Sequence, residues 1–195
     1  RVDVAKELDA FRYAKLASKA GLVVGTPATL SASTAAAALD LAIATMKENE
    51  VPLDGAKIFV TPTVKMYIGQ SSNYVKNVNG TLPNGRSIMF DTYEGLQVVE
   101  VPQTRFYTAI TLYDGTTSGE TEGGFIKSVT SGSVGYDINF MIVADNACLP
   151  VVKHNPSDLI DGSKDSGDYD AWVMKYRLYH DLFVPENKTK GIYTH

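Results

Sequence analysis

The most constraining feature of this sequence is a run of alternating side chains near its C-terminal end, from Asp170 to Tyr179. Successive side chains of a β-strand point to opposite faces. One face therefore holds Trp172, Met174, Tyr176 and Leu178, and the other holds Val173, Lys175, Arg177 and Tyr179. Such a strand reaches roughly 30 Å at about 3.3 Å per residue, more than a compact domain of this size usually gives to one element. We predict a strand that ties two lobes together, followed by a basic turn and a short closing strand.

The composition predicts one soluble domain with a real core and excludes several classes of protein. With 195 residues, 44% of them hydrophobic, the chain can bury about 70% of its unfolded surface without metal or disulfide support. A formal net charge of -4, with Lys and Arg spread along the chain, argues against tight nucleic-acid binding. Cys148 is the only cysteine and lies in an apolar run, which predicts a buried, inert thiol in a reducing compartment. No apolar stretch approaches the ~20 residues that span a bilayer.

Helical periodicity appears in three segments of the first third of the chain. Residues 2–20 form an amphipathic pattern that stops at Gly21, and a second helix opens at Ser31 or Ser33 and ends near Asn49. A third is expected up to about Ile68, with Thr61 as N-cap and Pro62 in the first turn. A short apolar strand at residues 57–60 precedes this third helix, and helix–strand–helix order favours a mixed sheet.

The middle of the chain reads as strands separated by turn and loop signals. Asn79-Gly80 and Asn84-Gly85 predict turns within one polar loop or hairpin. Strands are expected at residues 96–101, 106–112, 138–143 and 149–152. Pro102 would stand at an edge or bend. The Gly-, Ser- and Thr-rich residues 113–135 predict an excursion over the surface with a weak hairpin, and residues 161–170 a polar linker.

Candidate catalytic and metal-binding residues do not assemble into a recognisable site. His180 and Asp181 resemble part of a hydrolytic triad, but neighbours in a strand point to opposite faces, so Asp181 cannot orient the ring. His154, His180 and His195 are too dispersed for a metal site. The acidic run at residues 161–170 lacks the register of a calcium-binding EF-hand, and the Gly-rich stretches lack the lysine of a P-loop. We therefore predict no catalytic, cofactor-binding or metal-binding residues.

Four segments resemble, in a consistent order, the major capsid proteins of tailed bacteriophages. They are TLSASTAAAALDLAIATMKENEVPLDGAKIFVTPTVKMYI, GLQVVEVPQTRF, INFMIVADNACLPVVKH, and YRLYHDLFV with ENKTKGIYTH. The resemblance implies an α+β subunit of the Hong Kong 97-type fold. Residues 22–160 would form an axial-like domain. Residues 1–21, as the end of the spine helix, and residues 161–195, as linker and long C-terminal strand, would form a peripheral-like domain.

The resemblance implies a structural function and no enzymatic activity. Many copies would assemble, as hexamers and pentamers, into an icosahedral virion shell that encloses DNA without sequence-specific binding, with scaffolding and portal proteins as further partners. Assembly would take place in the cytoplasm of the bacterial host. Six residues on or after the terminal strand are candidate subunit contacts: Lys175, Arg177, Tyr179, Asp181, Glu186 and Tyr193.

Nothing before Val2 resembles the family's N-terminal arm and extended loop, which embrace neighbouring subunits, so we expect these residues alone to form a monomer or weak oligomer. Two alternatives stay open at this point. One is an encapsulin-like nanocompartment shell protein of the same fold, which encloses an enzyme instead of DNA. The other is a carbohydrate-binding or hydrolytic domain that uses the tyrosine-rich surface and the loop at residues 161–170.

Overall fold

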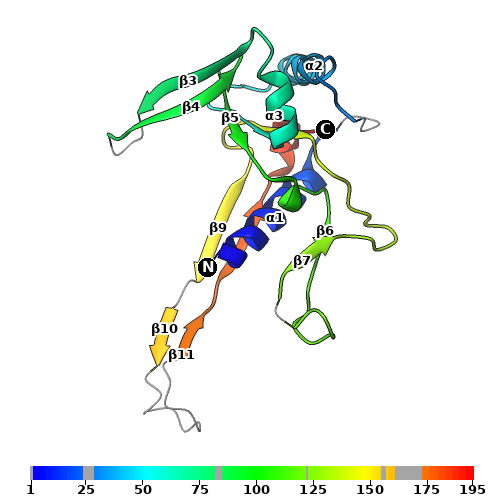
Figure 1. The fold of residues 1–195 in the computed structure, drawn as a ribbon, viewed down its shortest axis with the longest axis vertical. Helices are drawn as coiled ribbons and strands as arrows, with labels where there is room; N and C mark the ends of the chain where they lie inside the picture. The colour runs from blue at the N-terminus through cyan, green and yellow to red at the C-terminus, as the bar shows by residue number, and fades with distance from the viewer. Residues whose placement is uncertain (1, 24–28, 82–84, 122, 155–156, 161–172) are drawn as a thin grey trace. The chain divides into compact units, whose positions relative to one another are not determined.

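The fold is described from a computed structural model that covers residues 2–23, 29–81, 85–121, 123–154, 157–160 and 173–195 (Figure 1). The chain divides into two units. The first comprises Arg1–Cys148 with Val184–His195, and the second is Leu149–Phe183. The predicted linker at residues 161–170 and the strand position of Trp172 fall outside the described residues. Helices and strands both contribute to the first unit, so the α+β class expected from the sequence is confirmed.

A mixed seven-stranded sheet forms the centre of the first unit, with the order β1-β13-β8-β2-β5-β4-β3. β1 runs parallel to β13 and β2 parallel to β5, whereas the other neighbours are antiparallel. The bounds are β1 Leu22–Val23, β2 Lys57–Val60, β3 Tyr74–Thr81, β4 Ser87–Tyr93, β5 Leu96–Glu100, β8 Phe140–Val143 and β13 Ile192–Thr194. All four residues of β8 are buried, as expected for a continuous apolar run at the centre of a sheet.

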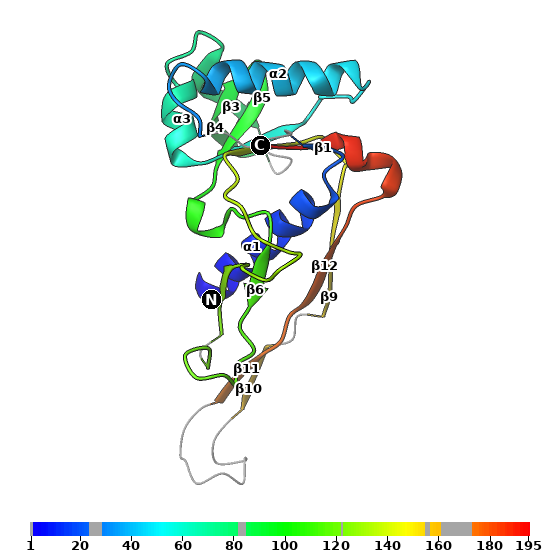
Figure 2. The same ribbon diagram turned by 90° about the vertical axis from the view of Figure 1, so that its right-hand side faces the viewer.

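Two neighbouring helices lie beside β4 and β5 of this sheet (Figures 1 and 2). α2 (Ala35–Glu48) buries Leu39, Ile43 and Met46. It begins slightly later than the sequence indicated, after a turn in which Ser31 O accepts the backbone N–H groups of Thr34 and Ala35. α3 (Pro62–Ile68) has the predicted N-cap, since Thr61 Oγ1 accepts the Val64 N–H at 3.3 Å.

The predicted first helix is confirmed as α1 (Val2–Lys19), and it packs through aromatic side chains. The Tyr13 ring meets Phe59 of β2 edge-on at 5.5 Å and Phe106 at 5.0 Å. Edge-to-face aromatic pairs add to the stabilisation from buried area. At the end of the helix, Gly21 N–H donates to Thr189 O at 2.8 Å, which fixes the 3-10 turn η2 (Glu186–Gly191) beside it. Among the described residues, no helix is long and apolar enough to cross a membrane.

The turn predicted at Asn79-Gly80 is wrong, because both residues lie inside β3 and pair with Met89 and Ile88 of β4. Glycine is required there for space, since a Cβ atom on Gly80 would collide with the ring of Phe90. The chain reverses instead near Gly85, whose φ of 79° is in the left-handed region. A second tight turn was not predicted: Glu94 and Gly95 both have positive φ, as a two-residue type I′ turn between β4 and β5 requires.

The strand predicted at residues 106–112 is shorter than expected. After Pro102 the chain forms the 3-10 turn η1 (Gln103–Arg105), and the strand β6 comprises only Ile110–Leu112. Phe106 is buried, and its N–H bonds back to Gln103 O instead of joining a sheet. β6 pairs with β7 (Phe125–Lys127), so only the second strand of this hairpin lies in the excursion expected at residues 113–135.

The second unit consists of two antiparallel strand pairs. β9 (Leu149–His154) pairs with β12 (Tyr179–Phe183), and β10 (Ser157–Ile160) pairs with β11 (Val173–Tyr176). The unbroken terminal strand predicted from the alternation is therefore wrong, because residues 177–178 separate β11 from β12. The register also shifts between Tyr179 and His180, as at a β-bulge, so the strict period of two ends there.

Candidate assembly surfaces

Three of the six predicted subunit contacts are exposed to solvent. Arg177 follows β11, Tyr179 begins β12 with 57% of its surface exposed, and Glu186 opens η2. A tyrosine with an exposed ring and hydroxyl is typical of protein interfaces. Their exposure is compatible with subunit contact, which stays a prediction for all three.

The other three predicted contacts have different surroundings. Lys175 lies in β11, but its side chain falls outside the described set. Asp181 is half-buried, and its Oδ1 accepts the backbone N–H of Leu182 at 2.7 Å. Tyr193 is only 5% exposed in β13 and stacks on Phe140 with 6.1 Å between ring centroids. Its burial favours a packing role inside the chain over contact with a neighbour.

The histidines are separated between the two units. His154 and His180 belong to β9 and β12, whereas His195 is buried beside β8, where its ring stacks on Phe140 at 5.0 Å. Its Nδ1 lies 3.2 Å from Asn139 Nδ2, and burial lowers the pKa of the imidazole. Within the described ranges, no group of three His, Cys, Asp or Glu residues could hold a metal ion. Cys148 is half-buried, and this burial raises the pKa of its thiol.

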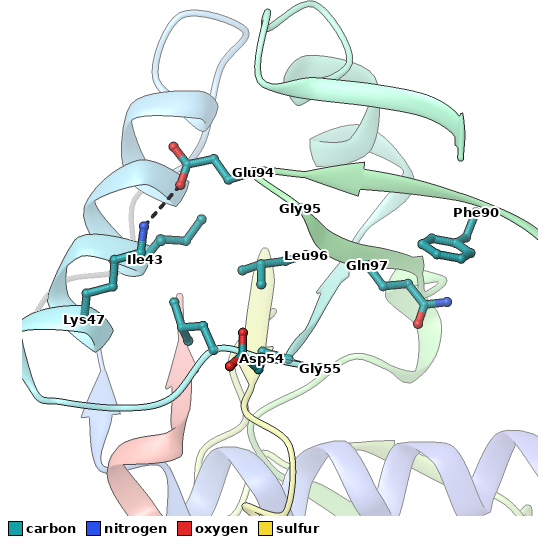
Figure 3. Close-up of a pocket in the computed structure, with 11 residues that line it drawn as sticks. Ile43, Lys47, Asp54, Gly55, Phe90, Glu94, Gly95, Leu96 and Gln97 are labelled. Carbon is teal, nitrogen blue, oxygen red and sulfur yellow. Dashed lines mark ion pairs between the residues drawn. The ribbon is translucent and has the colours of Figure 1, made fainter. Parts of the chain in front are cut away.

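A pocket of about 500 Å³ opens between α2, the turn before β2 and the start of β5 (Figure 3). Its apolar lining comes from Ile43, Leu53, Ala56, Phe90 and Leu96. Lys47 Nζ and Glu94 Oε2 form an ion pair of 3.6 Å across it, and Asp54 and Gln97 complete its polar lining. Its titratable side chains are Lys47, Asp54 and Glu94, and the first and last of these form the ion pair.

A polar network fixes the base of the β3–β4 hairpin. Asp91 accepts a hydrogen bond from Tyr74 Oη at 2.7 Å and from the Asn77 N–H at 3.2 Å, and Lys65 Nζ lies 3.1 Å from it. The hydrogen bond from Tyr74 is the main reason why the pKa of Asp91 is lowered. Lys65 also pairs with Glu100 at 3.2 Å. Desolvation lowers the pKa of Lys65, but the carboxylates of Asp91 and Glu100 outweigh it, so the pKa is raised. The α3 lysine therefore links the hairpin to β5.

Beyond this network the hairpin projects from the sheet. β4 pairs with β5 only through Asp91, Thr92 and Tyr93, so Ser87–Phe90 pair with β3 alone. Met89 is 70% exposed on this projecting part. On α2, Leu41 is 63% exposed. Neither residue was predicted from the sequence, although three consecutive apolar residues in β4 and the alanine- and leucine-rich residues of α2 were available signals.

The surface excursion between β6 and β8 also carries exposed apolar side chains. They are Leu112, Ile126, Val129, Val134 and Tyr136. Its turns are held by local bonds, such as Gly135 N–H to Ser128 O at 2.8 Å. A Cβ atom on Gly135 would collide with Ala109 O, so this loop requires glycine where it returns to β6.

Comparisons with known proteins give one kind of match. No protein-family model matches the sequence, and no curated protein is similar to it. Among solved structures, the chain is similar to one in the capsid structure of the cyanophage P-SCSP1u, with a TM-score of 0.57 and 16% identity. The alignment covers 98% of this chain and 61% of that one. The protein therefore has a phage-capsid-like α+β fold, and it spans about three fifths of the length of the capsid chain it matches.

Proposed function

We propose that this protein is the major capsid subunit of a tailed bacteriophage or prophage, with the Hong Kong 97-type fold. The observation that carries the proposal is the fold similarity to a phage capsid chain over 98% of these residues. The order of segments in the sequence supports the same family. In this role the protein is structural and catalyses no reaction.

The domain assignment of this proposal follows the sequence resemblance. Residues 22–160 are the axial-like domain, and residues 1–21 and 161–195 are the peripheral-like domain. The sheet of the first unit supports an axial core, since six of its seven strands come from residues 22–160. β13 is the exception, and its pairing with β8 connects the peripheral-like C-terminal segment to the axial sheet.

Assembly in this proposal relies on many weak contacts between identical subunits. Hexamers and pentamers repeat one heterologous contact around each axis, and shell closure multiplies its effect. The exposure of Arg177, Tyr179 and Glu186 supports a role in such contacts. The net charge of -4 supports a shell that encloses DNA without sequence-specific binding. Scaffolding and portal proteins are further partners, assembly occurs in the host cytoplasm, and the mature location is the virion.

Electron microscopy tests this proposal directly. The protein is expressed from its complete gene in bacteria, and the particulate fraction is imaged in negative stain. Icosahedral shells are the expected result. Only soluble protein, together with a measurable catalytic turnover, would refute a structural role. Nuclease-resistant DNA in shells formed during infection or prophage induction separates a capsid from a nanocompartment, in which an enclosed enzyme is expected instead.

A further inference from the structure

α2 has an apolar outer face as well as an apolar inner face. Its inner side chains, such as Leu39 and Met46, are fully buried against the rest of the unit. On the outside, Ala37, Leu41 and Ala44 follow each other at spacings of four and three residues, and all three are exposed. Exposed apolar strips of this kind mark contact surfaces in soluble proteins. The outer α2 face, defined by these three residues, is therefore open for a partner.

The projecting hairpin has one face that packs on itself and one that faces solvent. The strand register places four residues on the first face: Val78, Gly80, Ile88 and Phe90. The ring of Phe90 lies against Gly80, which has no side chain. On the opposite face, Asn79 pairs with Met89, whose side chain is 70% exposed. The hydrogen bonds of Asp91 hold the base of this ribbon. Met89 is thus an apolar side chain presented on an anchored projection.

The two surfaces carry opposite charges. Between Tyr74 and Tyr93 the charged residues are Lys76, Arg86 and Asp91, and Asp91 is already paired with Lys65. The end of α2 and the turn after it carry exposed Glu48, Glu50 and Asp54. Lys47, the lysine of this stretch, is paired with Glu94. A positive hairpin and a negative helix end are complementary, which favours correct encounter and register between partners.

The hairpin also projects away from α2 within the same unit (Figure 1). In Figure 1 the β3–β4 hairpin extends to the left and α2 lies at the upper right, and Figure 2 shows α2 nearest to the viewer with the hairpin strands behind it. One copy therefore cannot satisfy its own α2 face with its own hairpin. Two different surfaces that meet head to tail form a heterologous contact, which repeats around a closed ring.

From these observations we propose that the Met89 face of the hairpin of one copy docks on the outer α2 face of the next copy. Met89 packs against Leu41 and its alanine neighbours, while Lys76 and Arg86 approach Glu48 and Glu50. The inference rests on the proposed function, and it names the surfaces by which neighbouring subunits recognise each other within a ring.

Cysteine trapping tests the contact even where association is weak. Two single-cysteine proteins, Met89→Cys and Leu41→Cys, are made in a Cys148→Ser background, labelled with tags of different mass, mixed and oxidised. The expected product is a mixed disulfide well above the proportion given by random collision. The matched control replaces Leu41→Cys with Met66→Cys, because Met66 is 59% exposed on α3, outside the contact. A mixed disulfide no more abundant than in the control would overturn the inference.

Charge reversal supplies a second readout. Lys76→Glu is expected to weaken association in sedimentation about tenfold, which corresponds to ~1.4 kcal/mol, and Glu48→Lys in the same chain to restore part of it. Lys57→Glu, at an exposed position of β2 outside both surfaces, is the control. Icosahedral shells that form unchanged with Met89→Asp would overturn the inference and leave the proposed function intact. If the disulfide forms efficiently but the complete gene yields no shells, the contact between copies stands and the proposed capsid function is refuted.

Discussion

Replacing Gly21 by alanine tests how the end of α1 is joined to the C-terminal segment. A Cβ atom at this position would lie 2.7 Å from the carbonyl carbon of Thr189 and 2.8 Å from the nitrogen of Lys190. Both are backbone atoms, so η2 has to move as a whole. Overpacking typically costs about 1–3 kcal/mol, and the lost Gly21–Thr189 hydrogen bond about 1 kcal/mol more. We expect Gly21→Ala to reduce the free energy of unfolding by about 2–4 kcal/mol.

The measurement is urea unfolding followed by tryptophan fluorescence and circular dichroism, with thermal unfolding as a check. A loss of this size lowers the melting temperature by about 4–16 °C for a chain of this length. Lys19→Ala, a change at an exposed position two residues away, serves as the control and should shift stability little. If Gly21→Ala unfolds at the same urea concentration as the parent protein, the close approach of η2 to α1 is not a feature of the folded state.

Four further changes test other parts of the fold. Thr61→Ala removes the acceptor for the Val64 N–H and should cost about 1 kcal/mol in urea unfolding. Tyr93→Phe removes the hydroxyl that donates to Asp40 at 2.6 Å, with an expected loss of about 1–2 kcal/mol. Ile142→Ala opens a cavity in the fully buried β8 and should cost about 2–5 kcal/mol, enough to lower soluble expression. Burial lowers the pKa of His195 in the folded state, so the unfolded chain binds the proton first. Stability should therefore fall as the pH drops below 6.5, and His195→Phe should remove that slope; an unchanged slope would contradict it.

Elements with strong local signals could be predicted from the sequence. The capped helix that begins at Pro62, the strand at residues 57–60 and the buried run of β8 agree with the structure within two residues. In each case a cap, a proline or a continuous apolar run is decisive without help from distant residues. The type I′ turn at Glu94-Gly95 was missed because Glu is an unusual residue at positive φ, so no local pattern indicated it.

Features that depend on distant parts of the chain could not be predicted. Asn79-Gly80 has the composition of a turn, yet it lies within a strand because the Phe90 ring of the paired strand occupies the space beside it. The alternation after Asp170 gave no sign of the bulge at Tyr179, which arises from the register with β9. The burial of Tyr193 could not be predicted either, because it depends on β8, about fifty residues earlier in the chain.

The candidate surfaces were only partly accessible to the same reasoning. Arg177, Tyr179 and Glu186 are exposed, as their polar setting indicated. Leu41 and Met89 were not chosen, because an apolar side chain in an apolar segment is normally assigned to the core. Only the packing of α2 and the way the hairpin extends past β5 reveal which apolar residues remain outside.

The position of β13 has a consequence for synthesis on the ribosome. This strand lies between β1 and β8, so the sheet lacks one of its inner strands until residues 192–194 have left the exit tunnel. Translation supplies β1 to β8 first, and the edges of β1 and β8 that face β13 stay unpaired while residues 144–191 are added. A nascent subunit therefore cannot complete this sheet before residues 192–194 have been synthesised.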